Sequence, residues 1–177
     1  MDMPRPSMMS KVTSDQPPRT ADASPRAADT GLELSQTSER VYHMRIDRDG
    51  TWHHEGRPIA RKPLVKLFAS VLSREDDGDY WLITPVERGR IEVEDAPFIV
   101  IELSAQGSGQ LQTIYAKTNL DEWVAIGPDH PLRLRQPKVG DTKDLLPYIE
   151  IRPGLEGRLS RPSYYELVDL GESYTTG

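Results

Sequence analysis

The sequence carries the same short motif twice, once in each half. Glu55–Gly56–Arg57 is followed by an arginine and then by apolar residues at helical spacing, and Glu156–Gly157–Arg158 is followed by the same arrangement. Glycine readily adopts the left-handed conformation that tight turns need. The motif therefore predicts two similar halves, each with a strand, a Glu-Gly-Arg turn, an arginine and a helix.

Two short helices are expected after these turns. The first is predicted over Pro63–Leu72, where apolar residues recur three and four positions apart and form a wide face that would pack on a sheet. Proline suits the first helical position, because its missing N–H costs nothing there. The second helix is predicted over Pro162–Val168 on the same grounds.

The start of the folded part reads as a β-hairpin. Arg48–Asp49–Gly50 separates two segments of strand-like sequence, and Asp-Gly in that setting is a strong hairpin signal. A three-residue loop pairs Ile46 with Trp52 and Met44 with His54, which gathers the apolar side chains on one face, whereas a two-residue loop mixes the faces. In this register His54 points inward, and we expect it to be a core histidine.

Short strands are predicted along most of the remaining chain. They lie at Tyr80–Thr84, Arg90–Val93, Phe98–Ile101, Leu111–Lys117, Trp123–Ile126, Leu132–Leu134 and Tyr148–Ile151. Many short strands with only two helices favour an α+β fold over an alternating α/β fold. We expect mostly antiparallel, curved sheets with two short helices, built as two similar strand-turn-helix halves.

The composition predicts where the folded unit lies. Residues 1–35 are rich in Pro, Ser and Ala, lack aromatic residues and show no apolar periodicity, so we expect a disordered tail. Residues 36–171 are expected to form a single globular unit of two halves, about 40–105 and 106–171. Residues 172–177 are expected to be a frayed C-terminus.

Several classes of function are disfavoured by simple features of the chain. The net charge of −6 opposes non-specific binding to nucleic acid. No apolar run approaches the ~18 residues of a membrane helix, and no signal peptide is apparent. The chain has no cysteine and no phosphate-binding glycine loop or dinucleotide fingerprint. We expect a cytoplasmic protein with no cofactor and no nucleic-acid or membrane partner.

Some stretches have a more specific sequence. They are Thr84–Phe98, Arg45–Asp47 with Gly50 and Trp52, Gly127–Leu132, and Arg161–Pro162 with Tyr165–Leu167. In these stretches the chain resembles an uncharacterised bacterial family, the domain of unknown function 1285. The resemblance covers residues 40–171. It implies a two-part α+β fold with repeated motifs and a role in ligand binding or signalling, and it brings no catalytic residues.

Four arginines stand at the starts of the predicted helices, where the helix dipole disfavours cations. They are Arg57, Arg61, Arg158 and Arg161. An anion would relieve this conflict. It could be a bound phosphate or carboxylate, or an internal carboxylate such as Glu87, Glu94 or Asp95, and the sequence leaves both possibilities open alongside a plain solvated surface.

The predicted ligand-binding residues combine these arginines with one acidic and one aromatic side chain. They are Arg57, Arg61, Glu87, Arg158, Arg161 and Tyr165. Tyr165 and its neighbour Tyr164 could stack on a flat ligand, although at helical spacing tyrosines are more often part of the core. The leading interpretation is a cytosolic, non-enzymatic module that binds a small anionic ligand or a partner protein in signalling.

Three alternatives belong to other classes. A hydrolase could use Glu87, Asp95, Asp129 or His130, and it would need these groups around one concave pocket. The outer face of the first hairpin holds His43, His53 and Glu55, which could bind a metal, but solvated surface histidines explain them better. A structural homo-oligomer is the third alternative. We assign no catalytic residue and no metal ligand.

Overall fold

The computed structural model describes residues 38–171 of the chain. The predicted disordered tail at 1–35 and the predicted frayed end at 172–177 lie outside the described residues. Among the described residues, no helix is long and apolar enough to cross a membrane.

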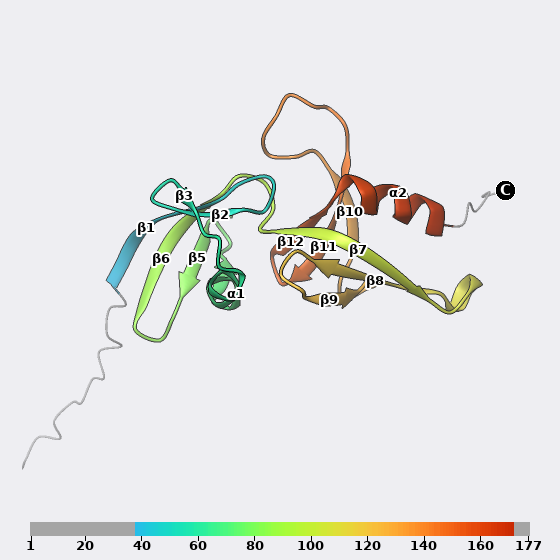
Figure 1. Ribbon diagram of the computed structural model, residues 1–177, viewed down its shortest axis with the longest axis horizontal. Coiled ribbons are helices and arrows are strands. Elements are labelled where there is room, and N and C mark those ends of the chain that lie inside the picture. Colours follow the sequence, from blue (N-terminus) through green and yellow to red (C-terminus); the bar gives the residue numbers. More distant parts are fainter. Residues whose placement is uncertain (1–37, 172–177) are drawn as a thin grey trace, which may run out of the picture. The chain divides into compact units, whose positions relative to one another are not determined.

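The first half of the described chain forms a six-stranded mixed sheet with one helix (Figure 1). Its order is β3-β2-β1-β6-β5-β4. The elements are β1 (Ser38–Ile46), β2 (Trp52–His54), β3 (Arg57–Pro58), α1 (Lys62–Ser70), β4 (Leu72–Arg74), β5 (Tyr80–Ile83) and β6 (Glu87–Val93). Neighbouring strands are antiparallel except β1 and β6, which pair in parallel.

The second half forms a sheet of the same design, in the order β10-β11-β12-β7-β8-β9 (Figure 1). Its elements are β7 (Phe98–Gln106), the short 3-10 helix η1 (Gly109–Leu111), β8 (Thr113–Thr118), β9 (Trp123–Ala125), β10 (Leu132–Arg135), β11 (Leu146–Arg152), β12 (Leu155–Leu159) and α2 (Arg161–Leu170). Here β7 and β12 form the parallel pair.

Each half is therefore a pair of three-stranded antiparallel meanders, joined because its first and last strands pair in parallel. This confirms the α+β fold in two similar halves. The chain passes from the first sheet to the second between β6 and β7. The sequence analysis placed the boundary between the two halves later, near residue 105. The helices are not equivalent, since α1 connects the two meanders of its half and α2 follows the last strand of the other.

The register of the first hairpin is confirmed. Ile46 pairs with Trp52 and Met44 with His54, and Gly50 is left-handed with a φ of 79°. Met44, Ile46 and Trp52 are buried, but the prediction that His54 is a core residue is wrong, because its side chain is exposed. The chain turns immediately after His54. On this face of the hairpin, Phe68 of helix α1 stacks on Trp52, with 6.3 Å between the ring centroids, and not on His54.

The two Glu-Gly-Arg motifs adopt different structures, so the predicted second turn is wrong. Gly56 lies in a turn with a φ of 77°, whereas Gly157 lies inside strand β12. The turn before β12 contains Gly154 instead, with a φ of 73°. Gly157 allows the neighbouring side chains to pack closely against the strand. A Cβ at this position would lie 3.1 Å from the side chain of Ile151 and 3.2 Å from that of Val100.

Both helices differ at their ends from the prediction. Helix α1 ends at Ser70, and Leu72 is instead the first, buried residue of β4. The apolar face of α1 is only partly covered, since Val65 and Ala69 are buried while Leu67 is 62% exposed. Helix α2 extends to Leu170, past the predicted end at Val168.

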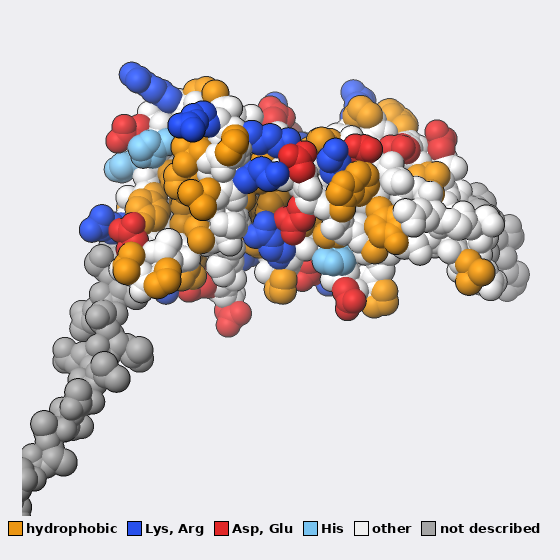
Figure 2. Space-filling view, turned by 60° about the horizontal axis from the view of Figure 1, so that its bottom comes forward, with side chains coloured by type: hydrophobic (Ala, Val, Ile, Leu, Met, Phe, Trp, Pro, Cys, Tyr) orange, Lys and Arg blue, Asp and Glu red, His pale blue; other side chains and the backbone are white. Residues whose placement is uncertain are grey.

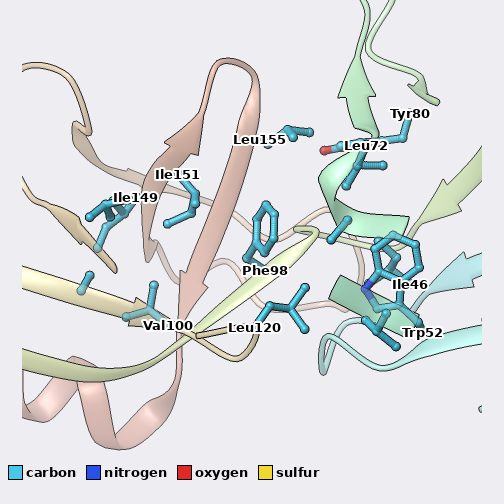
Figure 3. Close-up of a cluster of buried hydrophobic side chains, with 14 of the residues drawn as sticks. Ile46, Trp52, Leu72, Tyr80, Phe98, Val100, Leu120, Ile149, Ile151 and Leu155 are labelled. Atoms are coloured by element: carbon cyan, nitrogen blue, oxygen red, sulfur yellow. The ribbon is translucent and has the colours of Figure 1, made fainter. Parts of the chain in front are cut away.

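The buried apolar side chains of the two halves form one cluster (Figure 3). Ile46 and Trp52 come from the first sheet, and Phe98, Val100 and Ile151 from the second. Because residues of both sheets share this cluster, the segment between β6 and β7 is held close to the core, and its residues from Asp95 to Pro97 are buried.

Candidate functional site

A cavity of about 600 Å³ lies beside the start of α2 and brings together three of the six predicted ligand-binding residues. We call it the α2 groove, and its lining is Asp144, Leu145, Leu146, Pro147, Arg158, Leu159, Arg161, Tyr164 and Tyr165. The predicted residues among these are Arg158, Arg161 and Tyr165. They come from the end of β12 and the first turns of α2, which follow each other directly in the chain.

Most backbone positions in the first turn of α2 offer no free N–H group to a ligand. Ser160 caps the helix, because its Oγ accepts a hydrogen bond from the Ser163 N–H, and Pro162 has no N–H to offer. The Tyr164 N–H donates to the Ser160 carbonyl. An anion in the α2 groove would therefore be held mainly by side chains.

The two tyrosines of the α2 groove are exposed. Tyr164 is 41% exposed and Tyr165 58%, and their ring centroids lie 5.9 Å apart with the rings tilted by 47°. The more common core role for tyrosines at helical spacing does not apply here.

Arg158 is held in place by contacts on its inner side. Its Nη2 donates to the backbone carbonyl of Arg48 at 2.7 Å, and its Nε lies 3.4 Å from Asp95 Oδ2 without a well-aligned hydrogen bond. The side chain is 24% exposed. The internal-carboxylate hypothesis thus holds for Arg158 and Asp95, and Arg158 also lines the α2 groove.

Asp95 is the centre of a buried polar cluster, and its side chain is 2% exposed. It accepts hydrogen bonds from the Tyr148 hydroxyl at 2.8 Å, from Arg135 Nη1 at 3.1 Å and from the Lys138 N–H at 3.1 Å. Burial, together with the hydrogen bond to Asp95, raises the pKa of Tyr148 well above its ordinary value. Tyr148 therefore stays a neutral donor, and the cluster fixes the segment around Asp95 on the second sheet.

Arg135 extends this cluster. It lies over the ring of Tyr148 at 3.5 Å from the centroid and donates through Nε to Glu156 at 2.9 Å. Burial alone would lower the pKa of Arg135, but the charge of Glu156 and the hydrogen bonds to its carboxylate and to Asp95 raise it. Arg135 thus stays charged beside two acids.

A second cavity of about 380 Å³ adjoins the α2 groove, and Arg158 and Leu146 line both. We call it the loop cavity, because residues of the loop between β10 and β11 form much of its wall. The course of this loop is seen in Figure 1. Its remaining lining is Arg48, Asp49, Asp95, Pro137, Val139, Gly140, Asp141 and Thr142. Arg158 therefore stands where the two spaces meet.

The other three predicted residues lie outside the lining of the α2 groove. Arg57 is exposed on β3, and Arg61 is exposed at the N-cap of α1. Glu87 lies at the start of β6 and pairs with Arg40 at 3.3 Å. The structure thus divides the predicted set between the two halves of the chain.

At the start of α1, lysine side chains pair with a carboxylate of the protein itself, Asp121, which the sequence analysis did not single out. Asp121 lies 3.0 Å from Lys62 Nζ and 3.3 Å from Lys66 Nζ. The hydrogen bonds from these lysines lower the pKa of Asp121. On the face drawn in Figure 2, basic side chains likewise lie next to acidic ones.

The four residues of the hydrolase alternative are not brought together. Within residues 38–171, no hydrogen bond or ion pair joins any two of them. Glu87 pairs with Arg40, Asp95 is surrounded by cations, and His130 Nδ1 lies 2.9 Å from the Glu150 carbonyl. This arrangement gives no support to two-carboxylate chemistry.

The first hairpin has a cavity of its own, of about 720 Å³, lined in part by His43, His53 and Glu55. His53 Nε2 is engaged by Asp47 Oδ2 at 3.0 Å. Over the described part of the chain, no group of three or more His, Asp or Glu side chains is arranged to hold a metal ion.

Sequence reasoning missed Arg135, Tyr148, Asp121 and Arg48 as parts of these clusters. Their contacts join residues that are far apart in the chain, and the hairpin signal that contains Arg48 indicates a turn and not its contact with Arg158. Two members of the cluster carried a signal, Asp95 as part of the acidic stretch Thr84–Phe98 and Arg158 as part of the second Glu-Gly-Arg motif.

Two crystal structures resemble this chain. A DUF1285 family protein from Silicibacter pomeroyi DSS-3 is 39% identical, with a TM-score of 0.71 over 77% of this chain and 73% of that one. A DUF1285 family protein from Shewanella baltica OS155 is 29% identical, with a TM-score of 0.57 over 75% of this chain and 94% of that one. A search of curated proteins finds no match.

Family models match both halves of the folded chain. The N-terminal domain of the domain of unknown function DUF1285 matches residues 36–96, and the C-terminal domain of the same family matches residues 97–177. The junction follows Asp95 almost directly and coincides with the change from β6 to β7. The chain therefore belongs to the DUF1285 family, a family of unknown function, and contains both of its domains.

Proposed function

We propose that this chain is a cytosolic, non-enzymatic binding module that takes up a small anionic ligand in the α2 groove. The observation that carries the proposal is the meeting of Arg158, Arg161 and two exposed tyrosines in one cavity. Guanidinium groups bind phosphate or carboxylate through paired, charge-assisted hydrogen bonds. Exposed tyrosine faces can stack on a flat part of the same ligand.

Arg158 and Arg161 have different parts in this proposal. Arg158 is already fixed by Asp95 and the Arg48 carbonyl, so little side-chain freedom is lost when an anion binds. Arg161 is exposed at the first position of α2, and an anion beside it would offset its unfavourable place at the positive end of the helix dipole. The two arginines together favour a ligand with more than one anionic oxygen.

The lining favours binding over catalysis. Of the residues around the α2 groove, only Asp144 and the two tyrosines carry groups that act as general acids or bases, and the Asp144 carboxylate accepts the Thr142 hydroxyl at 2.9 Å. The groove thus offers recognition groups and no paired nucleophile and base among its lining residues.

Calorimetric titration of the full chain with phenyl phosphate tests the proposal, because this compound combines an anion with a flat ring. We expect Arg161→Ala and Tyr165→Ala each to weaken binding about tenfold or more, as expected for a lost hydrogen bond to a charged group or a lost stacking partner. Arg57→Ala is the matched control, since Arg57 is also exposed but does not line the groove. Equal binding by all three variants and the parent chain would rule the proposal out.

A further inference from the structure

The loop of the first hairpin contacts the second half of the chain at a residue of the α2 groove. We call residues 47–51, which connect β1 to β2, the hairpin loop. Its Arg48 carbonyl accepts a hydrogen bond from Arg158 Nη2 at 2.7 Å. Arg158 lines the α2 groove, and Arg48 and Asp49 belong to the wall of the adjoining loop cavity. A backbone group of the first half therefore holds an arginine of the proposed binding site.

The peptide unit that carries this carbonyl is fixed at both ends. Its N–H belongs to Asp49 and donates to Asp47 Oδ1 at 2.9 Å, while its carbonyl oxygen accepts from Arg158. Asp47 Oδ1 also accepts from the Thr51 N–H at 3.0 Å, and the Arg48 N–H donates to Glu94 Oε2 at 3.0 Å. Because a peptide unit is planar, bonds at both ends set the direction of the carbonyl.

Gly50 brings the hairpin loop against the second half at a second point. A Cβ on this residue would lie 2.7 Å from the side chain of Ile99 and 2.9 Å from Asn119 Nδ2. Asn119 Nδ2 donates to the Gly50 carbonyl at 3.4 Å, and its Oδ1 accepts from the Ile99 N–H at 3.1 Å. Gly50 is left-handed, with a φ of 79°. Only a residue without a side chain fits this contact in this conformation.

The loop sets the position of the Arg158 side chain without using all its donors. A guanidinium group has five N–H groups. Within residues 38–171, Nη2 bonds to the Arg48 carbonyl and Nε lies near Asp95, and no hydrogen bond or ion pair to the protein uses Nη1. A bound anion can therefore be held by a side chain that is already ordered. Ordering a free arginine on binding would weaken the affinity about threefold to tenfold.

We propose, on the basis of the proposed function, that the hairpin loop is a positioning element of the α2 groove and that anion binding is coupled to its docking on the second half. Gly50 is the positioning residue, because it lets the loop come close enough for the Arg48 carbonyl to hold Arg158. Such coupling is reciprocal: docking of the loop raises the affinity for the anion, and the bound anion stabilises the docked loop by the same factor.

The first test compares two glycine variants of the full chain by calorimetric titration with phenyl phosphate. Gly50→Ala drives a Cβ against Ile99 and Asn119, so it should displace the loop and weaken binding about threefold to tenfold. Gly56→Ala is the matched control. Gly56 has a similar φ of 77° in the same half, but an added Cβ meets nothing within 4 Å, so backbone strain is matched and the contact with the second half is absent. Gly56→Ala should bind as the parent does.

The second test needs no variant and uses the reciprocal effect. Saturating phenyl phosphate should slow hydrogen–deuterium exchange of the backbone N–H groups in the hairpin loop of the parent chain about threefold to tenfold. The turn at residues 75–79 is the internal control. It has a similar local bond, from the Asp79 N–H to Asp77 Oδ1 at 2.9 Å, and it lines neither cavity. Its exchange should not change.

The outcomes separate this inference from the proposed function. If phenyl phosphate binds in a manner that depends on Arg161, but the exchange of the hairpin loop is unchanged, the binding site stands and the coupling is overturned, whatever the variants show. An equal loss of affinity in Gly50→Ala and Gly56→Ala also overturns the coupling, because strain alone would then be the cause. If Gly50→Ala does not fold, the exchange measurement decides. If the parent chain does not bind phenyl phosphate, both proposals are overturned.

Discussion

Replacing Asp95 by alanine is expected to be among the most costly single changes in this chain. The carboxylate is nearly inaccessible and holds Tyr148, Arg135 and the backbone N–H of Lys138. Asp95→Ala would leave the buried Tyr148 hydroxyl without its acceptor. It would also remove a negative charge that lies beside Arg135 and Arg158. Removing one partner of a buried ion pair costs about 3–5 kcal/mol.

The lower end of that range applies, because Arg135 also forms an ion pair with Glu156 at 2.9 Å, which the variant would retain. We therefore expect a loss of about 3 kcal/mol in the free energy of unfolding. For a domain of this size the loss corresponds to a fall in Tm on the order of 10 °C. Urea denaturation and thermal unfolding of the full chain measure both quantities.

Glu102→Ala is the matched control. Glu102 pairs with Lys117 at 3.3 Å, but its side chain is 53% exposed, so its loss should cost less than about 1 kcal/mol. Equal, small losses for both variants would refute the view that the buried cluster stabilises the fold. Combining Asp95→Ala with Tyr148→Phe gives a second check, since the double variant should lose less than the sum of the two single losses.

Three further changes probe single features of the fold. Gly89→Ala would place a Cβ against the ring of Tyr42 and should lower the free energy of unfolding by about 1–3 kcal/mol in denaturation experiments. The loss should be smaller in a Tyr42→Ala background. An equal loss in both backgrounds would refute this contact. Gly154→Ala, at a φ of 73°, should cost about 1–2 kcal/mol of unfolding free energy, and a neutral result would contradict the strained turn. Burial alone would raise the pKa of Asp47, but hydrogen bonds from His53 and two backbone N–H groups lower it below its ordinary value. Its stabilisation is present above the unfolded pKa of about 3.9 and is lost as the pH falls through the folded value. Asp47→Asn should therefore lower Tm at pH 7 and have little effect at pH values well below 4, and a difference that persists there would show that charge is not the cause.

Features that depend on neighbouring residues could be predicted from the sequence. The pairing of Ile46 with Trp52 follows from alternation and an Asp-Gly turn, and the structure confirms it. Arg158, Arg161 and Tyr165 lie close together in the chain, so a strand running directly into a helix brings them to one groove. Steric limits on the backbone and the periodicity of apolar residues are sufficient to explain these results.

Features that depend on packing between distant segments could not be predicted. The two Glu-Gly-Arg motifs look alike, yet one lies in a turn and the other in a strand, because Gly157 has to fit against Ile151 and Val100. The same holds for His54, whose exposure depends on how far the neighbouring helix covers its strand. Such outcomes are decided by which side chains occupy the adjacent space.

The sequence by itself determined the strand-rich α+β class, the hairpin register and the local association of the α2 groove residues. Only the tertiary structure decided that Asp95 would be buried against Arg135 and Tyr148 and that Arg158 would stand between two cavities. The reason is physical. Backbone conformation and hydrophobic period act between neighbours in the chain, whereas the energy of a buried charge depends on partners that only the folded chain brings within hydrogen-bonding distance.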